Sequence, residues 1–202
     1  LKPEYPEALN NLGNTYRELG DSKLAIEYIS QAINLKPNFA EALNNIGAAY
    51  EDEEKFDISI NYYEKSLRIN PNYSEAYFNL ANSLRSEGNI KKAITFYKKA
   101  ISLKPFFPSA YKNLSLAELL SNDYKSGWIH HEWRWKIKNS KKPHAEPQLQ
   151  QWKGEDLKKN EKLLVVSEQG YGDTLQFMRY ISYIKQQKID ISFCAQKKLH
   201  GL

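Results

Sequence analysis

A 34-residue repeat constrains this chain more than any other feature of its sequence. Four prolines recur at that interval, namely Pro3, Pro37, Pro71 and Pro105. The same interval aligns an alanine (Ala8, Ala42, Ala76, Ala110) and a bulky aliphatic residue (Leu12, Ile46, Leu80, Leu114). A fixed interval of this length is typical of repeat architectures, in which each unit is one supersecondary motif that buries its apolar side against its neighbours.

Each unit predicts two amphipathic helices joined by a short turn. Apolar residues recur every three or four positions in both halves of a unit, which is the spacing of one helix face. Turn-forming or polar pairs separate the halves, and these are Gly20-Asp21, Glu53-Glu54, Gly88-Asn89 and Ser121-Asn122. We therefore expect an all-α helical repeat solenoid with units at about 6–39, 40–73, 74–107 and 108–138.

The fourth unit departs from the others. Glu118 stands where the first two units have a tyrosine, and Gly127 stands where the first and third units have an alanine at the helix crossing. Its second helix is rich in aromatic residues, including Trp128, Trp133 and Trp135. These features predict a divergent cap or a joint to a following element, and a packed cap is favoured over a ligand cage.

The composition changes after residue 138. The stretch 136–147 is basic and contains two prolines, so residues 139–162 are interpreted as a linker. Leu163–Val166 is a short apolar run of the kind found in buried parallel strands, a turn at Gly170–Asp173 precedes a helical pattern, and alternating apolar residues follow from Ile189. Residues 163–202 are therefore expected to form an incomplete α/β strand-helix-strand unit, since such a unit cannot stand alone as a domain.

Charge and composition exclude several classes of function. Residues 1–106 hold 13 Lys and Arg against 14 Asp and Glu, so the basic excess is confined to the second half. This argues against nucleic-acid binding by the repeats. The chain has one cysteine, Cys194, and four histidines whose spacing is not that of metal ligands. The sequence therefore predicts neither a disulfide framework nor a metal site. The absence of a long apolar run predicts no membrane span, and a cytoplasmic location is the expectation.

An asparagine row is the feature that packing alone does not require. Asn11, Asn45, Asn79 and Asn113 are aligned by the repeat, with Asn14 and Asn82 three residues further on. Asn is a mediocre helix former, and its carboxamide both donates and accepts hydrogen bonds, as a clamp on the backbone of an extended peptide requires. The alternative is that each asparagine bonds the backbone of a neighbouring unit.

These units resemble the tetratricopeptide repeat. The resemblance covers about residues 1–138 and rests on small residues at fixed positions, on Tyr16 and Tyr50 in the first helices, and on the closing prolines. It implies that the first helices line an inner surface that binds a protein or peptide partner. Because Leu1-Lys2-Pro3 matches the closing residues of a unit, the chain is expected to begin inside a longer array.

The amino-acid sequence of the repeats is also similar to that of the repeats in protein O-linked N-acetylglucosamine transferases. Glu-Ala-Leu-Asn-Asn-Leu-Gly at 7–13 recurs almost unchanged at 41–47. In that family an asparagine row holds the peptide backbone. The resemblance implies a largely sequence-independent grip on an extended peptide, and a protein-interaction scaffold is the first hypothesis for function.

The tail carries a second resemblance. Glu-Trp-Arg-Trp at 132–135, the stretch 151–157 and the stretch 167–177 are similar to bacterial proteins in which such repeats precede a heptosyltransferase-like glycosyltransferase domain with two facing lobes. That family implies Gly170 and Gly172 at an acceptor-side turn and Asp173 as a general base. The alternative is that Asp173 only caps the following helix.

The alternative function is therefore an acceptor-recruiting arm of a repeat-fused glycosyltransferase. By the same resemblance the nucleotide-sugar site belongs mostly to a second lobe that these residues do not include. We expect no cofactor and no catalysis in this chain by itself, and a nucleotide sugar only in a longer protein.

Overall fold

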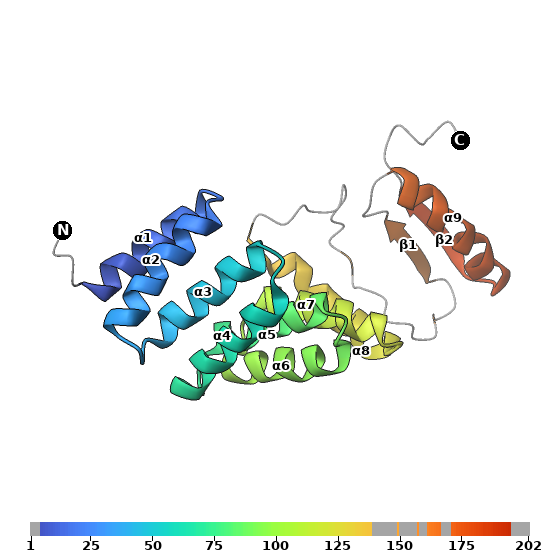
Figure 1. The fold of residues 1–202 in the computed structure, drawn as a ribbon. Helices are drawn as coiled ribbons and strands as arrows, with labels where there is room; N and C mark the ends of the chain where they lie inside the picture. Colours follow the sequence, from blue (N-terminus) through green and yellow to red (C-terminus); the bar gives the residue numbers. More distant parts are fainter. Residues whose placement is uncertain (1–4, 139–148, 150–156, 158–160, 167–170, 195–202) are drawn as a thin grey trace. The chain divides into compact units, whose positions relative to one another are not determined.

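The computed structural model describes residues 5–138, 149, 157, 161–166 and 171–194 (Figure 1). Contacts divide the chain into two compact units, Leu1–Lys138 and Asn139–Leu202. Within α9, the side chains of residues 171–177 and 179 are not described. Each of the two units is treated by itself below.

The first compact unit is a solenoid of four helix pairs, as the repeat predicts. The first helices are α1 (Pro6–Glu18), α3 (Ala40–Asp52), α5 (Ser74–Ser86) and α7 (Pro108–Leu120), and the second helices are α2 (Ser22–Leu35), α4 (Phe56–Ile69), α6 (Ile90–Leu103) and α8 (Tyr124–His131). Every helix packs against the next one along the chain, and the first helices of neighbouring pairs also contact each other. The first helices therefore form a continuous row.

Local chemistry explains where these helices begin and end. The Asp21 carboxylate accepts a hydrogen bond from the backbone N–H of Leu24, and Asp123 accepts one from Ser126, so both cap second helices. The turns between paired helices pass through a residue with positive φ, at Gly20, Glu54, Gly88 and Asn122. Glycine adopts this conformation without strain, whereas Glu54 does so at some energetic cost.

The core lies between the helices of each pair and the first helix of the next. One cluster is built around Ile29, Phe39 and Ile46, and a second around Tyr63, Leu80 and Tyr97. All six residues are at most 9% exposed. Full burial of such a side chain contributes about 1.5–3 kcal/mol, so these clusters hold consecutive pairs in a fixed register.

The fourth pair ends in a 3₁₀ helix, η1 (Glu132–Lys136), which packs against α7. Trp133 stacks on Tyr111 with ring centroids 3.9 Å apart, and the Lys136 ammonium lies 3.7 Å from the Trp133 ring centroid. Trp128 remains 60% exposed. The tryptophans therefore occupy different environments, and Trp133 is part of a packed end to the array.

The second compact unit contains one strand-helix-strand motif. β1 (Lys162–Val166) pairs in parallel with β2 (Asp190–Cys194), with Lys162 opposite Asp190, and α9 (Tyr171–Gln186) connects them. This confirms the α/β tail expected from the sequence. A single pair of parallel strands is smaller than a stable sheet normally is.

Candidate functional site

Small residues on the first helices set how closely each pair packs. A Cβ atom added at Gly13 would lie 2.5 Å from Cγ1 of Ile29, and one added at Gly47 would lie 2.7 Å from Cε1 of Tyr63. Neither position has room for a side chain without a shift of its neighbours. The close approach fixes the orientation of each first helix, and with it the side chains that project from the row.

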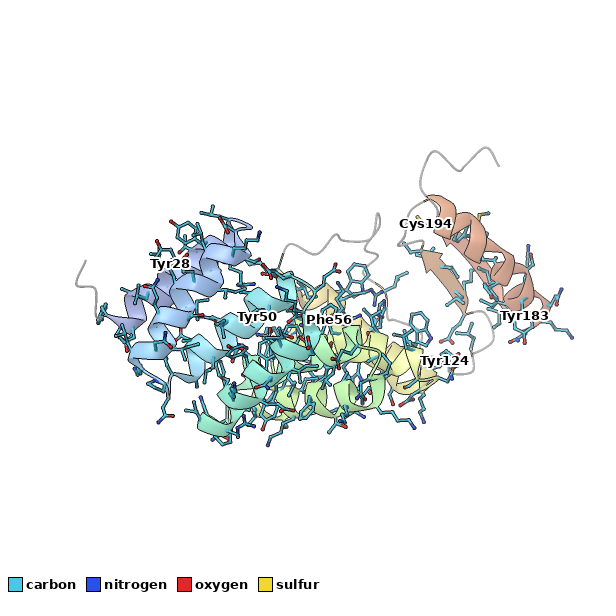
Figure 2. The ribbon with its side chains drawn as sticks, in the orientation of Figure 1. Tyr28, Tyr50, Phe56, Tyr124, Tyr183 and Cys194 are labelled. Atoms are coloured by element: carbon cyan, nitrogen blue, oxygen red, sulfur yellow. The ribbon has the colours of Figure 1, made fainter. Side chains whose placement is uncertain are left out.

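Stacked aromatic side chains also join the two helices of the first pair and the two helices of the second pair. Tyr16 stacks on Tyr28, with ring centroids 5.3 Å apart, and Tyr50 stacks on Tyr62 at 5.6 Å. Tyr28 and Tyr50 are labelled in Figure 2, on α2 and α3. Offset stacking of this kind contributes about 0.5–1.5 kcal/mol beyond burial.

In the fourth pair, polar groups replace that aromatic contact. Glu118 and His130 occupy the aligned positions, and Oε2 of Glu118 lies 2.7 Å from Nδ1 of His130. Glu118 is only 1% exposed, and its other carboxylate oxygen, Oε1, lies 3.5 Å from the Lys98 ammonium. Gly127 is needed beside this contact, since a Cβ there would lie 2.7 Å from Cγ of Leu119.

The asparagine row is joined by hydrogen bonds between units. Asn45 donates from Nδ2 to Oδ1 of Asn10 at 3.0 Å, and Asn79 donates to Oδ1 of Asn44 at 3.0 Å. Each bond connects a first helix to the preceding first helix. The alternative expected from the sequence was a bond to neighbouring backbone, whereas the acceptor in each case is a side-chain carboxamide.

These bonds form one continuous chain of side chains across α1, α3 and α5. Asn10 donates to Oε1 of Glu41 at 3.3 Å, and Asn44 donates to Oδ1 of Asn45 at 3.4 Å, a long and weak contact. Asn10 and Asn44 are 1% and 6% exposed, whereas Asn45 and Asn79 are only partly buried. The buried amides therefore hold the outer ones in position.

The junction between the third and fourth pairs differs. Phe78 occupies the position of Asn10 and Asn44, and its ring packs against Phe107 at 4.9 Å and Tyr97 at 6.0 Å. Because a phenyl ring cannot accept the bond, Asn113 donates instead to Oδ1 of Asn82 at 2.8 Å. Asn82 also accepts from the Tyr97 hydroxyl at 2.7 Å.

Charged groups flank the amides along the row. Arg17 lies 3.3 Å from Asp52 on the next first helix. Glu7 is paired with Lys36 at 2.7 Å and Glu75 with Lys104 at 2.6 Å. The position of these lysines is occupied by Asn70 in the second unit, so Glu41 has no such partner.

Burial raises the pKa of the Glu51 carboxyl, against the opposing effect of a hydrogen bond from the Tyr63 hydroxyl at 2.8 Å. Burial likewise raises the pKa of Tyr63, and the neighbouring Glu51 carboxylate adds to that effect. The two groups form a partly buried polar contact at the carboxyl end of α3.

The remaining residues expected from the sequence are placed as follows. Asn11 is exposed on α1, and Asn14 donates to Glu18 within the same helix at 3.0 Å. Asn45, Asn79, Asn82 and Asn113 take part in bonds between units. The sequence reasoning missed Asn10 and Asn44, the buried acceptors, although the doublets Asn10-Asn11 and Asn44-Asn45 were a signal for them.

The turn residues of the tail are less fully described. Gly170 lies outside the described residues, and Gly172 and Asp173 lie in the first turn of α9. The helix begins at Tyr171, which makes Asp173 its third residue, and the cap and general-base roles of Asp173 stay predictions. An acidic residue in the first turn is favoured by the helix dipole, which explains why the sequence suggested a cap.

Two further properties concern the described residues as a whole. They contain no cluster of three His, Cys, Asp or Glu side chains arranged to hold a metal ion. No helix among them has the length and apolar character needed to cross a membrane.

The repeats match known families at the level of sequence. Two family models, both described as tetratricopeptide repeat, match residues 6–39 and 38–105. A search of curated protein sequences gives no significant match.

Solved structures share the same fold. A crystal structure of MamA is 29% identical with a TM-score of 0.61, over 67% of this chain and 79% of that one. The first tetratricopeptide repeat domain of Spaghetti (RPAP3), bound to the HSP90 peptide SRMEEVD, is 19% identical with a TM-score of 0.57, over 60% and 97%. An O-GlcNAc transferase from Thermobaculum terrenum is 20% identical with a TM-score of 0.62, over 65% and 26%.

Proposed function

Because residues 6–105 are tetratricopeptide repeats, we propose that they act as a protein-interaction scaffold. The row of first helices binds an extended polypeptide segment through its asparagine side chains. One observation carries the proposal. The carboxamides of Asn45, Asn79 and Asn113 are partly exposed, and each uses one N–H to reach the preceding unit.

A carboxamide has two N–H donors and an oxygen with two lone pairs. One donor of each amide is therefore used within the array, and a second N–H of Asn45 and Asn79 remains, whereas the Asn113 amide also contacts the Tyr97 hydroxyl. In the described residues, the oxygens of Asn79 and Asn113 accept no hydrogen bond. A free N–H beside a free C=O matches the alternating groups of a peptide backbone, which is the complementarity that the proposal uses.

The bonds between units support this role. They hold each outer amide in one orientation before a ligand arrives, so less conformational entropy is lost on binding. Bonding within the array and bonding to a ligand are therefore compatible uses of the same side chain.

The test is a comparison of two double variants of the full 202-residue chain. A library of 12-residue peptides is first screened for binding, and dissociation constants are then measured by fluorescence anisotropy. Asn45→Ala/Asn79→Ala removes the central amides, and the matched control Asn34→Ala/Asn61→Ala makes the same changes at exposed positions of α2 and α4.

We expect the first double variant to bind at least about fivefold more weakly, since each lost hydrogen bond is worth about 0.5–1.5 kcal/mol. The control should bind as the wild type does. Circular dichroism of both variants separates lost binding from lost folding. Equal affinity of the two folded variants would remove the amides from the site.

The tail favours a second candidate function. A parallel strand-helix-strand motif follows the repeats, and open α/β sheets bind ligands at the carboxyl ends of their strands. In the second candidate, the repeats recruit an acceptor polypeptide for a glycosyltransferase that includes this motif. Gly170, Gly172 and Asp173 would then lie on the acceptor side, with Asp173 as the general base. Loss of sugar transfer in Asp173→Asn, within a protein extended beyond residue 202, is the expected result.

A further inference from the structure

Uncompensated carboxylates are not evenly distributed along the row of first helices. Glu18 on α1 and Glu41 on α3 are exposed, and each accepts a hydrogen bond only from a neutral asparagine, Asn14 or Asn10 respectively. Among the described residues, neither carboxylate has a cation within ion-pair distance. In the described part of the chain, each carboxylate therefore lies beside the asparagine row without a compensating cation.

The other carboxylates of α1, α3 and α5 have different environments, and Glu51 is partly buried and accepts a hydrogen bond from the neutral Tyr63 hydroxyl. Glu7 and Glu75 are paired with lysines, and Asp52 is paired with Arg17. That last pair also removes Arg17 as a binding group for an anionic ligand. The part of the row formed by α1 and α3 is consequently anionic, although the whole chain has a net charge of +5.

The opposite end of the row differs in sign. α7 carries Lys112, which is exposed, and no acidic residue of α7 is exposed, since its one carboxylate, Glu118, is buried. The row therefore has a direction, from anionic at α1 and α3 to cationic at α7. A bound peptide would meet this gradient along its length.

We propose that the peptide held by this row carries a basic side chain opposite α1 and α3, so that the site selects cationic extended segments over acidic ones. The inference rests on the proposed function, and it adds the charge of the ligand to it. The alternating amide groups of the ligand meet the asparagines, and its lysine or arginine meets Glu18 and Glu41.

Charge complementarity also separates this site from its structural relative. The peptide SRMEEVD seen with the Spaghetti domain ends in acidic residues. An acidic ligand would approach two uncompensated carboxylates here, and like charges in one site are repulsive. The shared fold therefore does not extend to the same ligand.

The test uses three 12-residue peptides on an otherwise uncharged Ala-Ser background. The two central residues are both Lys in the first peptide, both Gln in the second and both Glu in the third. Binding to the full 202-residue chain is measured by fluorescence anisotropy at low and at physiological salt. We expect the Lys peptide to bind about fivefold more tightly than the Gln peptide, as two partly exposed ion pairs would give, and the Glu peptide to bind most weakly. The preference should shrink as salt is added.

Isosteric variants assign the effect. Glu18→Gln/Glu41→Gln keeps both hydrogen-bond acceptors and removes both charges, so the ratio of the Lys and Gln dissociation constants should fall to about one. Glu27→Gln/Glu64→Gln makes the same change at exposed positions of α2 and α4 and should leave the ratio intact. Equal binding of the Lys and Gln peptides to the wild type, or a preserved ratio in the first variant, would overturn the inference while the proposed function stands. Failure of all three peptides to bind would overturn both.

Discussion

Asn45 donates a hydrogen bond from Nδ2 to Oδ1 of Asn10 over 3.0 Å, and so ties α3 to α1 through two amides that lie one residue more than a whole unit apart in sequence. The same arrangement joins Asn79 to Asn44. The outer partner is partly exposed and the inner one is buried. One side chain in each pair therefore serves the stability of the array, and the other is available to a ligand.

The buried partners should matter more for stability than the exposed row. Asn44→Ala removes the acceptor of Asn79 and leaves a partly buried donor without its bond, which costs about 1–3 kcal/mol. Asn11→Ala changes an exposed side chain and should alter stability by less than about 0.5 kcal/mol. Urea denaturation followed by circular dichroism measures both, and equal effects would contradict the assignment.

The close packing at Gly13 predicts a specific coupling. Gly13→Ala places a Cβ 2.5 Å from Cγ1 of Ile29 and 3.0 Å from the carbonyl oxygen of Ala25, so we expect a loss of about 1–3 kcal/mol despite the better helix propensity of alanine. In an Ile29→Ala background the cost should be smaller because the crowding atom is gone. A double-mutant cycle measures the coupling, and additive effects would exclude this contact as the cause.

The contact between Glu118 and His130 in the fourth unit can be tested against the third unit. Glu118→Ala empties a buried site and leaves His130 without its partner, which costs about 2–4 kcal/mol. Glu118→Leu/His130→Phe copies Leu84 and Phe96 of the third unit and should be as stable as the wild type within about 1 kcal/mol. Thermal unfolding compares them, and a double variant as unstable as Glu118→Ala would show that the polar pair is required.

Glu51 should make stability depend on pH. Its pKa is raised in the folded state, chiefly by burial, so the folded protein binds a proton more readily than the unfolded chain does. The associated stabilisation is complete below the unfolded pKa and is lost as pH rises through the folded pKa. Relative to Glu51→Gln, the wild type should therefore gain stability as pH falls from 7 toward about 4.3, the usual glutamate pKa. Denaturation at several pH values measures the difference between the two proteins, and parallel curves would exclude Glu51.

The 34-residue period was sufficient to predict the helix pairs, since the spacing of small and apolar residues such as Gly47 and Tyr63 reports directly which faces touch. The identity of each amide's partner was not predictable in the same way. Asn45 and Asn79 reach Asn10 and Asn44 because of how neighbouring first helices are offset, and that offset depends on the packing of the intervening second helices.

Two other features could not be predicted from the sequence for related reasons. Glu118 was visible as a departure from the repeat, but its contact with His130 depends on the fold of the fourth pair and on the space left at Gly127. The sequence suggests Asp173 as a cap of α9, and the structure places it third in that helix, which begins at Tyr171. Helix ends are decided by small differences in hydrogen bonding, so a single polar residue locates them only approximately.

Phe78 also determines how this array could be lengthened by design. Because the second unit presents Asn44 to its successor, tandem copies of that unit would repeat the same amide bond at every new boundary. Copies of the third unit would present a phenyl ring there, and each following asparagine would have to use the acceptor at the position of Asn82, as Asn113 does. The natural order of units is therefore not interchangeable, and the second unit is the suitable building block for a longer synthetic array.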